Sequence, residues 1–247
     1  MNENTLWFSY TLKPYNLDEP GFFNKADFSW TKHLEKNYPT FKKETERFLE
    51  KATLTPYFNR SLSDKKNSWK TSGLLHWGLF VKENYVHFRE SWAIIKQIPG
   101  IVSFSVSWLK AGSRIKEHNG DTNAIVRVHI PIRVPAQAPT CSFTVKNESR
   151  SWEEGKVLLF NDAQLHHAQN LSDEDRVVLI LDVIRPEFLY QKDSICAKVL
   201  NGLIWQWMTQ GYPTIRKYPL WFKKGMWSTI RFSLRQFLKY QRSFVWK

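Results

Sequence analysis

The stretch that decides the fold reads FSVSWLKAGSRIKEHNGDTNAIVRVHIPIRV over residues 104–134 and CSFTVKNESRSWEEGKVLLFNDAQLHHAQNLSDEDRVVLILDVIRP over residues 141–186. Apolar and polar positions alternate along it, and Gly, Pro, Asn and Asp divide it into short runs. This pattern predicts several antiparallel strands joined by turns. The expected strands lie near residues 101–110, 124–134, 141–146, 157–160 and 176–184.

Several polar side chains interrupt this apolar pattern. Two histidines, His118 and His166, could together hold a divalent first-row metal, since imidazole suits iron and zinc. Arg127 and His129 are two residues apart in the strand AIVRVHIPI, so their side chains share one face and indicate a polar cavity inside the barrel. Arg176 opens the apolar run RVVLILDVI, where a buried guanidinium needs a partner such as a carboxylate. Each residue alone is more typical of an ordinary surface or core position, so the prediction depends on their joint spacing.

The whole stretch resembles the aspartyl/asparaginyl β-hydroxylase family of iron- and 2-oxoglutarate-dependent oxygenases. The matching segments are HNGDTNAIVRVHIPI, NESRSWEEGKVLLFNDAQLHH and LDVIRPEF, and weaker similarity extends over roughly residues 20–190. The resemblance implies a mainly β fold with a double-stranded β-helix (jelly-roll, cupin-like) core over about residues 101–187. We expect an oxygenase domain over residues 1–200 with an N-terminal helical flank, followed by a helical extension over residues 201–247.

The resemblance also implies a metal site. By position, His118 and His166 would ligate Fe(II) and, with Arg127, form the catalytic group. The wider oxygenase pattern has an acidic ligand two residues after the first histidine, but Gly120 occupies that position here. Either a water completes the metal site, or the neighbouring Asp121 contacts the metal or its water.

The resemblance implies two cosubstrates, 2-oxoglutarate and dioxygen. Arg176 and Ser107 would hold the distal carboxylate of 2-oxoglutarate. Arg127 and His129 would line the pocket beside the metal and contact the inner carboxylate of the cosubstrate or the substrate. The substrate itself is left open between a protein or peptide side chain, an amino-acid metabolite and an acyl chain of a membrane lipid.

The charge of the chain is unevenly distributed. The net charge is +13, and residues 203–247 carry nine Lys and Arg with no Asp or Glu, which leaves 13 − 9 = +4 for the first 202 residues. Trp, Tyr and Phe alternate with these basic residues, as is typical of a basic amphipathic helix with interfacial aromatics. The extension could pack on the barrel, lie on an anionic membrane or bind nucleic acid, and the aromatic pattern favours membrane over nucleic acid.

Other sequence features bear on the compartment and on the class of protein. Two cysteines give no disulfide framework, and neither a signal peptide nor a run of about 18 apolar residues is visible. We therefore expect a cytoplasmic protein that could be peripheral at the inner membrane face. The alternative to an enzyme is a non-catalytic β-barrel module that uses its basic extension to hold an anionic membrane or nucleic acid.

Overall fold

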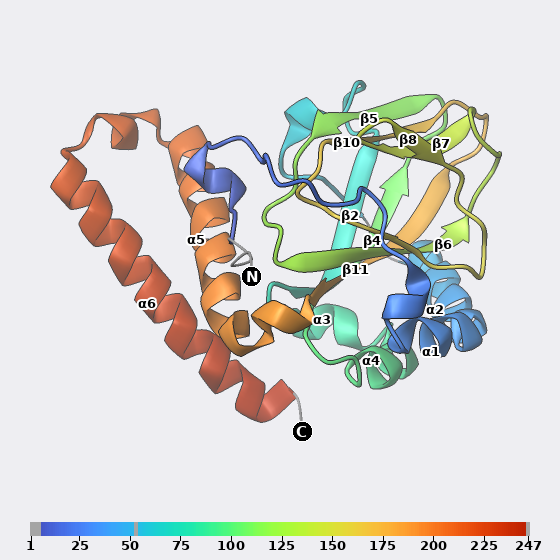
Figure 1. Cartoon of the computed structure of the whole chain (residues 1–247), viewed down its shortest axis with the longest axis horizontal. Helices are drawn as coiled ribbons and strands as arrows, with labels where there is room; N and C mark the ends of the chain where they lie inside the picture. Colours follow the sequence, from blue (N-terminus) through green and yellow to red (C-terminus); the bar gives the residue numbers. More distant parts are fainter. Residues whose placement is uncertain (1–5, 52–53, 246–247) are drawn as a thin grey trace.

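The structure is a computed structural model that describes residues 6–51 and 54–245. Residues 1–5, 52–53 and 246–247, which fall in the expected domain and extension, lie outside this description, as do the side chains from Arg242 onward. Two antiparallel sheets face each other at the centre, N-terminal helices cover one side, and two long helices stand beside the barrel (Figure 1).

The larger sheet forms one side of the barrel and contains most of the expected strands. Its spatial order is β1 (Thr55–Pro56), β2 (Trp69–His76), β4 (Ile101–Leu109), β11 (Arg176–Ile184), β6 (Ile125–Arg133) and β9 (Leu158–Phe160), with β3 (Leu79–Phe80) paired to β2. The central strands β4, β11 and β6 are buried along nearly their whole length. Because both faces of these strands are covered, their sequences are apolar runs rather than strict alternations.

The smaller sheet closes the barrel from the other side. Its order is β5 (Ser113–His118), β10 (His166–Asn170), β7 (Cys141–Val145) and β8 (Glu148–Arg150). Side chains of both sheets interdigitate in one apolar cluster, which includes Phe143, Trp152, Phe160 and Val178. This arrangement confirms the double-stranded β-helix that the resemblance implied.

The N-terminal helices cover the outer face of the larger sheet. They are α1 (Trp30–Lys36), α2 (Tyr38–Lys51), α3 (Lys82–Tyr85) and α4 (Arg89–Ile95), with short 3-10 turns η1 (Ser9–Thr11), η2 (Lys25–Asp27) and η3 (Arg60–Leu62). Leu34, Phe41 and Phe48 from this flank share a buried cluster with Phe104 and Leu179 of the sheet. The expected helical flank is therefore confirmed.

After the barrel the chain continues through η4 (Pro186–Gln191), α5 (Lys192–Gly211), η5 (Pro213–Lys217) and α6 (Leu220–Val245), so the expected extension over residues 201–247 begins within α5. Helix α5 runs through residue 201 without interruption. Its residues Ile195 and Val199 pack with Val102 and Ile184 of the barrel, and Leu238 of α6 joins the same cluster. Among the described residues, no helix is both long and apolar enough to cross a membrane.

Candidate functional site

The two predicted metal-binding histidines lie side by side in the smaller sheet. His118 ends β5 and His166 begins β10, and the two residues are direct partners in the antiparallel register. Their ring centroids are 4.2 Å apart, and the rings face the interior of the barrel together with Phe143 and Phe160. The fold therefore brings together two imidazoles separated by almost fifty positions in the sequence.

Both histidines have the hydrogen-bond pattern of metal ligands. The Nδ1 atom of each ring is 2.8 Å from a backbone carbonyl two residues earlier, that of Lys116 for His118 and that of Gln164 for His166. A carbonyl only accepts, so each Nδ1 carries the proton and each Nε2 keeps its lone pair. Burial lowers the pKa of His118 to about 4, and burial with the neighbouring His118 holds the pKa of His166 well below its usual value. Neutral rings are the form that binds metal.

A carboxylate fills the place where the acidic ligand of related oxygenases would start. A Cβ atom added to Gly120 would lie 1.6 Å from Oδ2 of Asp162, a contact that no real side chain can make. Asp162 is fully buried, its Oδ1 lies 3.7 Å from Nε2 of His166, and its backbone carbonyl accepts the Gly120 amide at 2.7 Å. The glycine is therefore required for space, because the Asp162 side chain approaches the histidines from the turn between β9 and β10.

Arg127 is held by two aspartates. Its Nε and Nη2 donate to the two carboxylate oxygens of Asp182 at 2.6 and 3.1 Å, and its Nη1 donates to Asp162. Burial raises the pKa of Asp162 to about 7, with Asp182 and Asp121 adding to the rise and Arg127 opposing it. Burial likewise raises the pKa of Asp121 to about 6. Three acids around one arginine leave an excess of negative charge, which a divalent cation at the histidines would offset.

The expected cosubstrate residues lie deeper in the barrel. Arg176 is 1% exposed, and its guanidinium carbon lies 4.9 Å from the ring centroid of Trp152. Its Nε and Nη2 have no hydrogen-bond partner among the residues that the structure describes. Ser107, on the neighbouring strand β4, accepts from Trp69 Nε1 at 3.1 Å and keeps its own proton to donate. A buried cation without a partner is costly, so this pair of donors fits a carboxylate.

His129 lies between the arginines as a neutral donor. Trp152 Nε1 donates to His129 Nδ1 at 3.1 Å, so the proton of the ring is on Nε2. Burial, followed by the charges of Arg176 and Arg127, holds the pKa of His129 well below its usual value. The turn that presents Trp152 depends on Gly155, which has a φ of +82°.

One cavity of about 890 Å³ connects these residues. All six predicted site residues line it: Ser107, His118, Arg127, His129, His166 and Arg176. Asp121, the alternative third ligand, also lines it. In the described part of the chain, no three His, Cys, Asp or Glu side chains are arranged to hold a metal ion. The protein itself offers two imidazoles, which leaves coordination positions for a cosubstrate and water.

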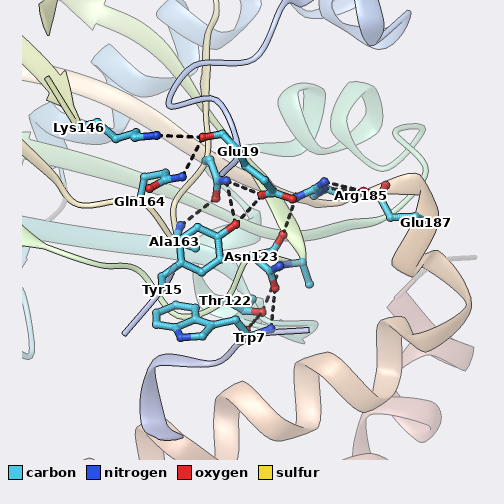
Figure 2. A network of polar contacts seen from close by, with 12 residues as sticks. Trp7, Tyr15, Glu19, Thr122, Asn123, Lys146, Ala163, Gln164, Arg185 and Glu187 are labelled. Atoms are coloured by element: carbon cyan, nitrogen blue, oxygen red, sulfur yellow. Dashed lines mark hydrogen bonds and ion pairs between the residues drawn. The ribbon is translucent and has the colours of Figure 1, made fainter. Parts of the chain in front are cut away.

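Sequence reasoning missed Asp162, Asp182 and the N-terminal segment around Glu19, which we call the strap and which contacts the turn that carries Asp162. The strap crosses the turn before His166, and Figure 2 shows Glu19 at the centre of its polar network. Arg185 Nη1 donates to both Glu19 oxygens at 2.9 and 2.8 Å, and Asn161 Nδ2 donates to Oε2 at 2.8 Å. The strap therefore fixes the turn from its outer side while the next residue, Asp162, points inward.

The fold and the site together define a jelly-roll protein with two histidines side by side in its cavity. The model of the family described as aspartyl/asparaginyl β-hydroxylase matches residues 35–186. This match covers more than half of the chain, so the protein belongs to the aspartyl/asparaginyl β-hydroxylase family.

Individual relatives show how far the similarity extends. The chain is 33% identical over 183 residues to an ornithine lipid ester-linked acyl 2-hydroxylase of Rhizobium tropici, covering 72% of this chain and 65% of that protein. It is 33% identical over 93 residues to an aspartyl/asparaginyl β-hydroxylase of Mus musculus, covering 38% of this chain and 12% of that protein. The chain thus spans less than two thirds of these relatives. Among solved structures, a Pseudomonas putida prolyl-4-hydroxylase superposes with a TM-score of 0.43 and 12% identity, covering 67% of this chain and 90% of that one.

Proposed function

We propose that the protein is an Fe(II)- and 2-oxoglutarate-dependent dioxygenase that hydroxylates an unactivated carbon of an acyl chain in a lipid. The observation that carries the proposal is the pairing of two neutral imidazoles, the half-buried His118 and the buried His166, with the buried guanidinium of Arg176, whose Nε and Nη2 have no partner among the described residues, in one cavity. Such a cavity offers a place for a cation at one point and for a carboxylate at another. The family to which the chain belongs supports the same class of reaction.

His118 and His166 would hold the iron through their Nε2 atoms. The backbone carbonyls at Nδ1 fix the tautomer of each ring and increase its basicity as a ligand. Asp162, held by Arg127, would accept a hydrogen bond from a water on the metal, because its carboxylate lies beside His166 without a direct bond to it. When bound, iron supplies the activation of dioxygen, which leaves one oxygen atom in the substrate and one in succinate, with release of carbon dioxide.

Arg176 and Ser107 would bind the distal carboxylate of 2-oxoglutarate. The guanidinium provides two unpaired N–H groups and the serine hydroxyl a third donor. His129, protonated on Nε2 only, would donate to the same cosubstrate without adding a charge. The walls around these polar groups exclude bulk water, which favours hydroxylation over side reactions.

Two observations support a lipid acyl chain as the substrate. The relative named as an ornithine lipid acyl 2-hydroxylase is 33% identical to this chain over 183 residues, which is 72% of the chain. The cavity is also much larger than the cosubstrate needs, and its remaining walls are mostly apolar side chains such as Leu62, Trp77, Val199 and Leu203. A long apolar chain would fill such a space.

The test is succinate formation by the purified protein, reconstituted anaerobically with iron(II) and then given oxygen, 2-oxoglutarate and a lipid extract. We expect succinate, together with lipids heavier by one oxygen atom in mass spectrometry. Arg176→Ala should raise the KM for 2-oxoglutarate by on the order of 100-fold, because it removes a charged pair in a buried site. Arg133→Ala, which changes an exposed arginine that pairs with Glu46, is the matched control and should leave the KM unchanged.

The outcomes separate this proposal from a non-catalytic module. Replacing His118 and His166 together by Ala should abolish iron binding and succinate formation. If the wild-type protein binds no iron and forms no succinate with any lipid, the oxygenase proposal is wrong. Succinate formation that responds to peptides and not to lipids would retain the chemistry and replace the substrate.

A further inference from the structure

The exposed aromatic side chains of the protein are concentrated in the C-terminal helices. Of the ten aromatic side chains that are strongly exposed in the described part of the chain, only Phe58 and Tyr190 lie outside them. The other eight are Trp207, Tyr212, Tyr218, Trp221, Phe222, Phe232, Phe237 and Tyr240. Single exposed apolar residues are ordinary, but a cluster of them marks an interaction surface.

Five of these rings gather where α5 turns into α6. We call residues 207–224 the tip; they include the end of α5, all of η5 and the start of α6, and Figure 1 shows this turn at the end of the helix pair away from the barrel. Tyr212 is 62% exposed, Leu220 63% and Trp221 74%. The tip therefore presents large apolar groups to the surroundings.

The tip is also strongly basic. It carries Arg216, Lys217, Lys223 and Lys224, and the chain has no acidic residue from 203 to 247. The same combination continues along the outer side of α6, where Trp221 and Phe232 point in the same direction about three turns apart. Aromatic side chains next to cations, without acids, complement an anionic bilayer surface in both polarity and charge.

The cavity of the candidate active site reaches the tip. Thr209 and Arg216 of the tip line it, as does Gln206 immediately before. At its other end the same cavity contains His118 and His166. The extension is thus a wall of the cavity as well as an exposed surface, since the inner side of α5 packs on the barrel.

We propose that the tip docks the protein on an anionic phospholipid bilayer, with its rings at the level of the headgroups and its Lys and Arg side chains against lipid phosphates. The mouth of the cavity then faces the membrane surface, so that an acyl chain can enter beside Arg216 and extend toward the histidines. The proposed membrane docking depends only on the exposed rings and charges of the tip. The entry of an acyl chain into the cavity rests in addition on the proposed function.

The first test is co-sedimentation of the full chain with vesicles. We expect binding to vesicles of equal parts phosphatidylglycerol and phosphatidylcholine at physiological ionic strength, and much weaker binding to phosphatidylcholine alone. Replacing Lys217 and Lys224 by Glu should lower the partition coefficient by at least about tenfold. The matched control replaces Lys43 and Lys96, two exposed lysines on α2 and after α4, by Glu, and it should bind nearly as the wild type does because the tip is intact.

A second pair of variants tests the rings. Trp221→Ser with Phe222→Ser should lower binding by a similar factor, while Tyr190→Ser, which changes an exposed ring outside the extension, should not. Neither tip variant changes a residue that lines the cavity, so basal succinate formation without vesicles should be unchanged. Failure of this inference and failure of the proposed function are therefore distinguishable.

Three outcomes would overturn the docking surface. The full chain could ignore anionic vesicles, the tip variants could bind as tightly as the wild type, or the lysine control could lose as much binding as the tip variant. Binding of duplex DNA or RNA at the same salt concentration, without binding of vesicles, would assign the basic surface to nucleic acid instead.

Discussion

The histidine cavity and the tip contain similar side chains in opposite surroundings. In the cavity, the guanidinium of Arg127 is fixed by two carboxylates, and Arg176 is almost wholly buried. At the tip, Arg216 and Lys217 are exposed among exposed rings. A buried charge depends on one specific partner, whereas exposed charges act together through the field that they create. Single substitutions should therefore have large effects in the cavity and small effects at the tip.

The largest difference in the free energy of unfolding should be between substitutions of two arginines, one in the cavity and one on α6. Arg127→Met removes the partner of Asp162 and Asp182, and leaving buried acids uncompensated should lower the free energy of unfolding by about 3–5 kcal/mol. Arg231→Met changes an exposed arginine of α6 and should shift it by less than about 0.5 kcal/mol. Denaturant unfolding of both variants measures the difference. Equal effects would show that burial does not decide the role of these arginines.

A second prediction concerns the glycine beside the histidines. Gly120→Ala places a methyl group where the Asp162 carboxylate lies, so the acid must move away from His166. Metal affinity should fall on the order of 10–100-fold, as for other losses of groups that orient a metal site. Gly211→Ala, at the end of α5, meets nothing within 4 Å and should leave affinity unchanged. Anaerobic iron(II) titration would contradict this account if Gly120→Ala bound as tightly as the wild type.

The strap gives a third prediction, of intermediate size. Glu19→Gln keeps the shape of the side chain but removes the charge that Arg185 and Asn161 contact, at a cost of about 2 kcal/mol at pH 7. Burial raises the pKa of Glu19, but hydrogen bonds from Arg185 and Tyr15 outweigh it and lower the pKa overall. The stabilisation by the charge is therefore present above the ordinary pKa of glutamate and is lost as the pH falls through the lowered value. The difference between wild type and variant should shrink on acidification, which unfolding at neutral and acidic pH would measure.

The sequence predicted the larger sheet better than the smaller one. Strands β4, β6 and β11 are long apolar runs, and their positions agree with those expected. The two strands that carry the histidines, β5 and β10, were not among the expected strands, because SRIKEH and HHAQN are largely polar and lack a clear apolar face. Their strand conformation depends on pairing with each other, which is a long-range contact.

The same limit applies within the site. The histidines and the two arginines stood out as polar residues within an apolar strand pattern, and the resemblance then implied their roles. Asp162 was missed because it lies in a turn, NDAQL, where an acid is ordinary. Only the register between β5 and β10 brings its carboxylate into the space left by Gly120. The absence of a side chain at Gly120 was visible in the sequence, but the group that uses the space was not.

The smallest effects should come from single changes at the tip, and their combination provides the sharpest comparison. Lys217→Gln and Lys224→Gln should each weaken binding to anionic vesicles about fivefold, and the double variant by about the product, because exposed charges contribute nearly independently. In the cavity, Arg127→Met and Asp182→Asn should be strongly non-additive, because the first substitution already removes the partner of the second. Vesicle binding of the two single lysine variants and their double variant measures additivity at the tip. Denaturant unfolding of the Arg127 and Asp182 variants, singly and together, measures it in the cavity. If the two cavity substitutions were additive, or the two tip substitutions strongly coupled, burial would not explain the difference between the charges of the cavity and those of the tip.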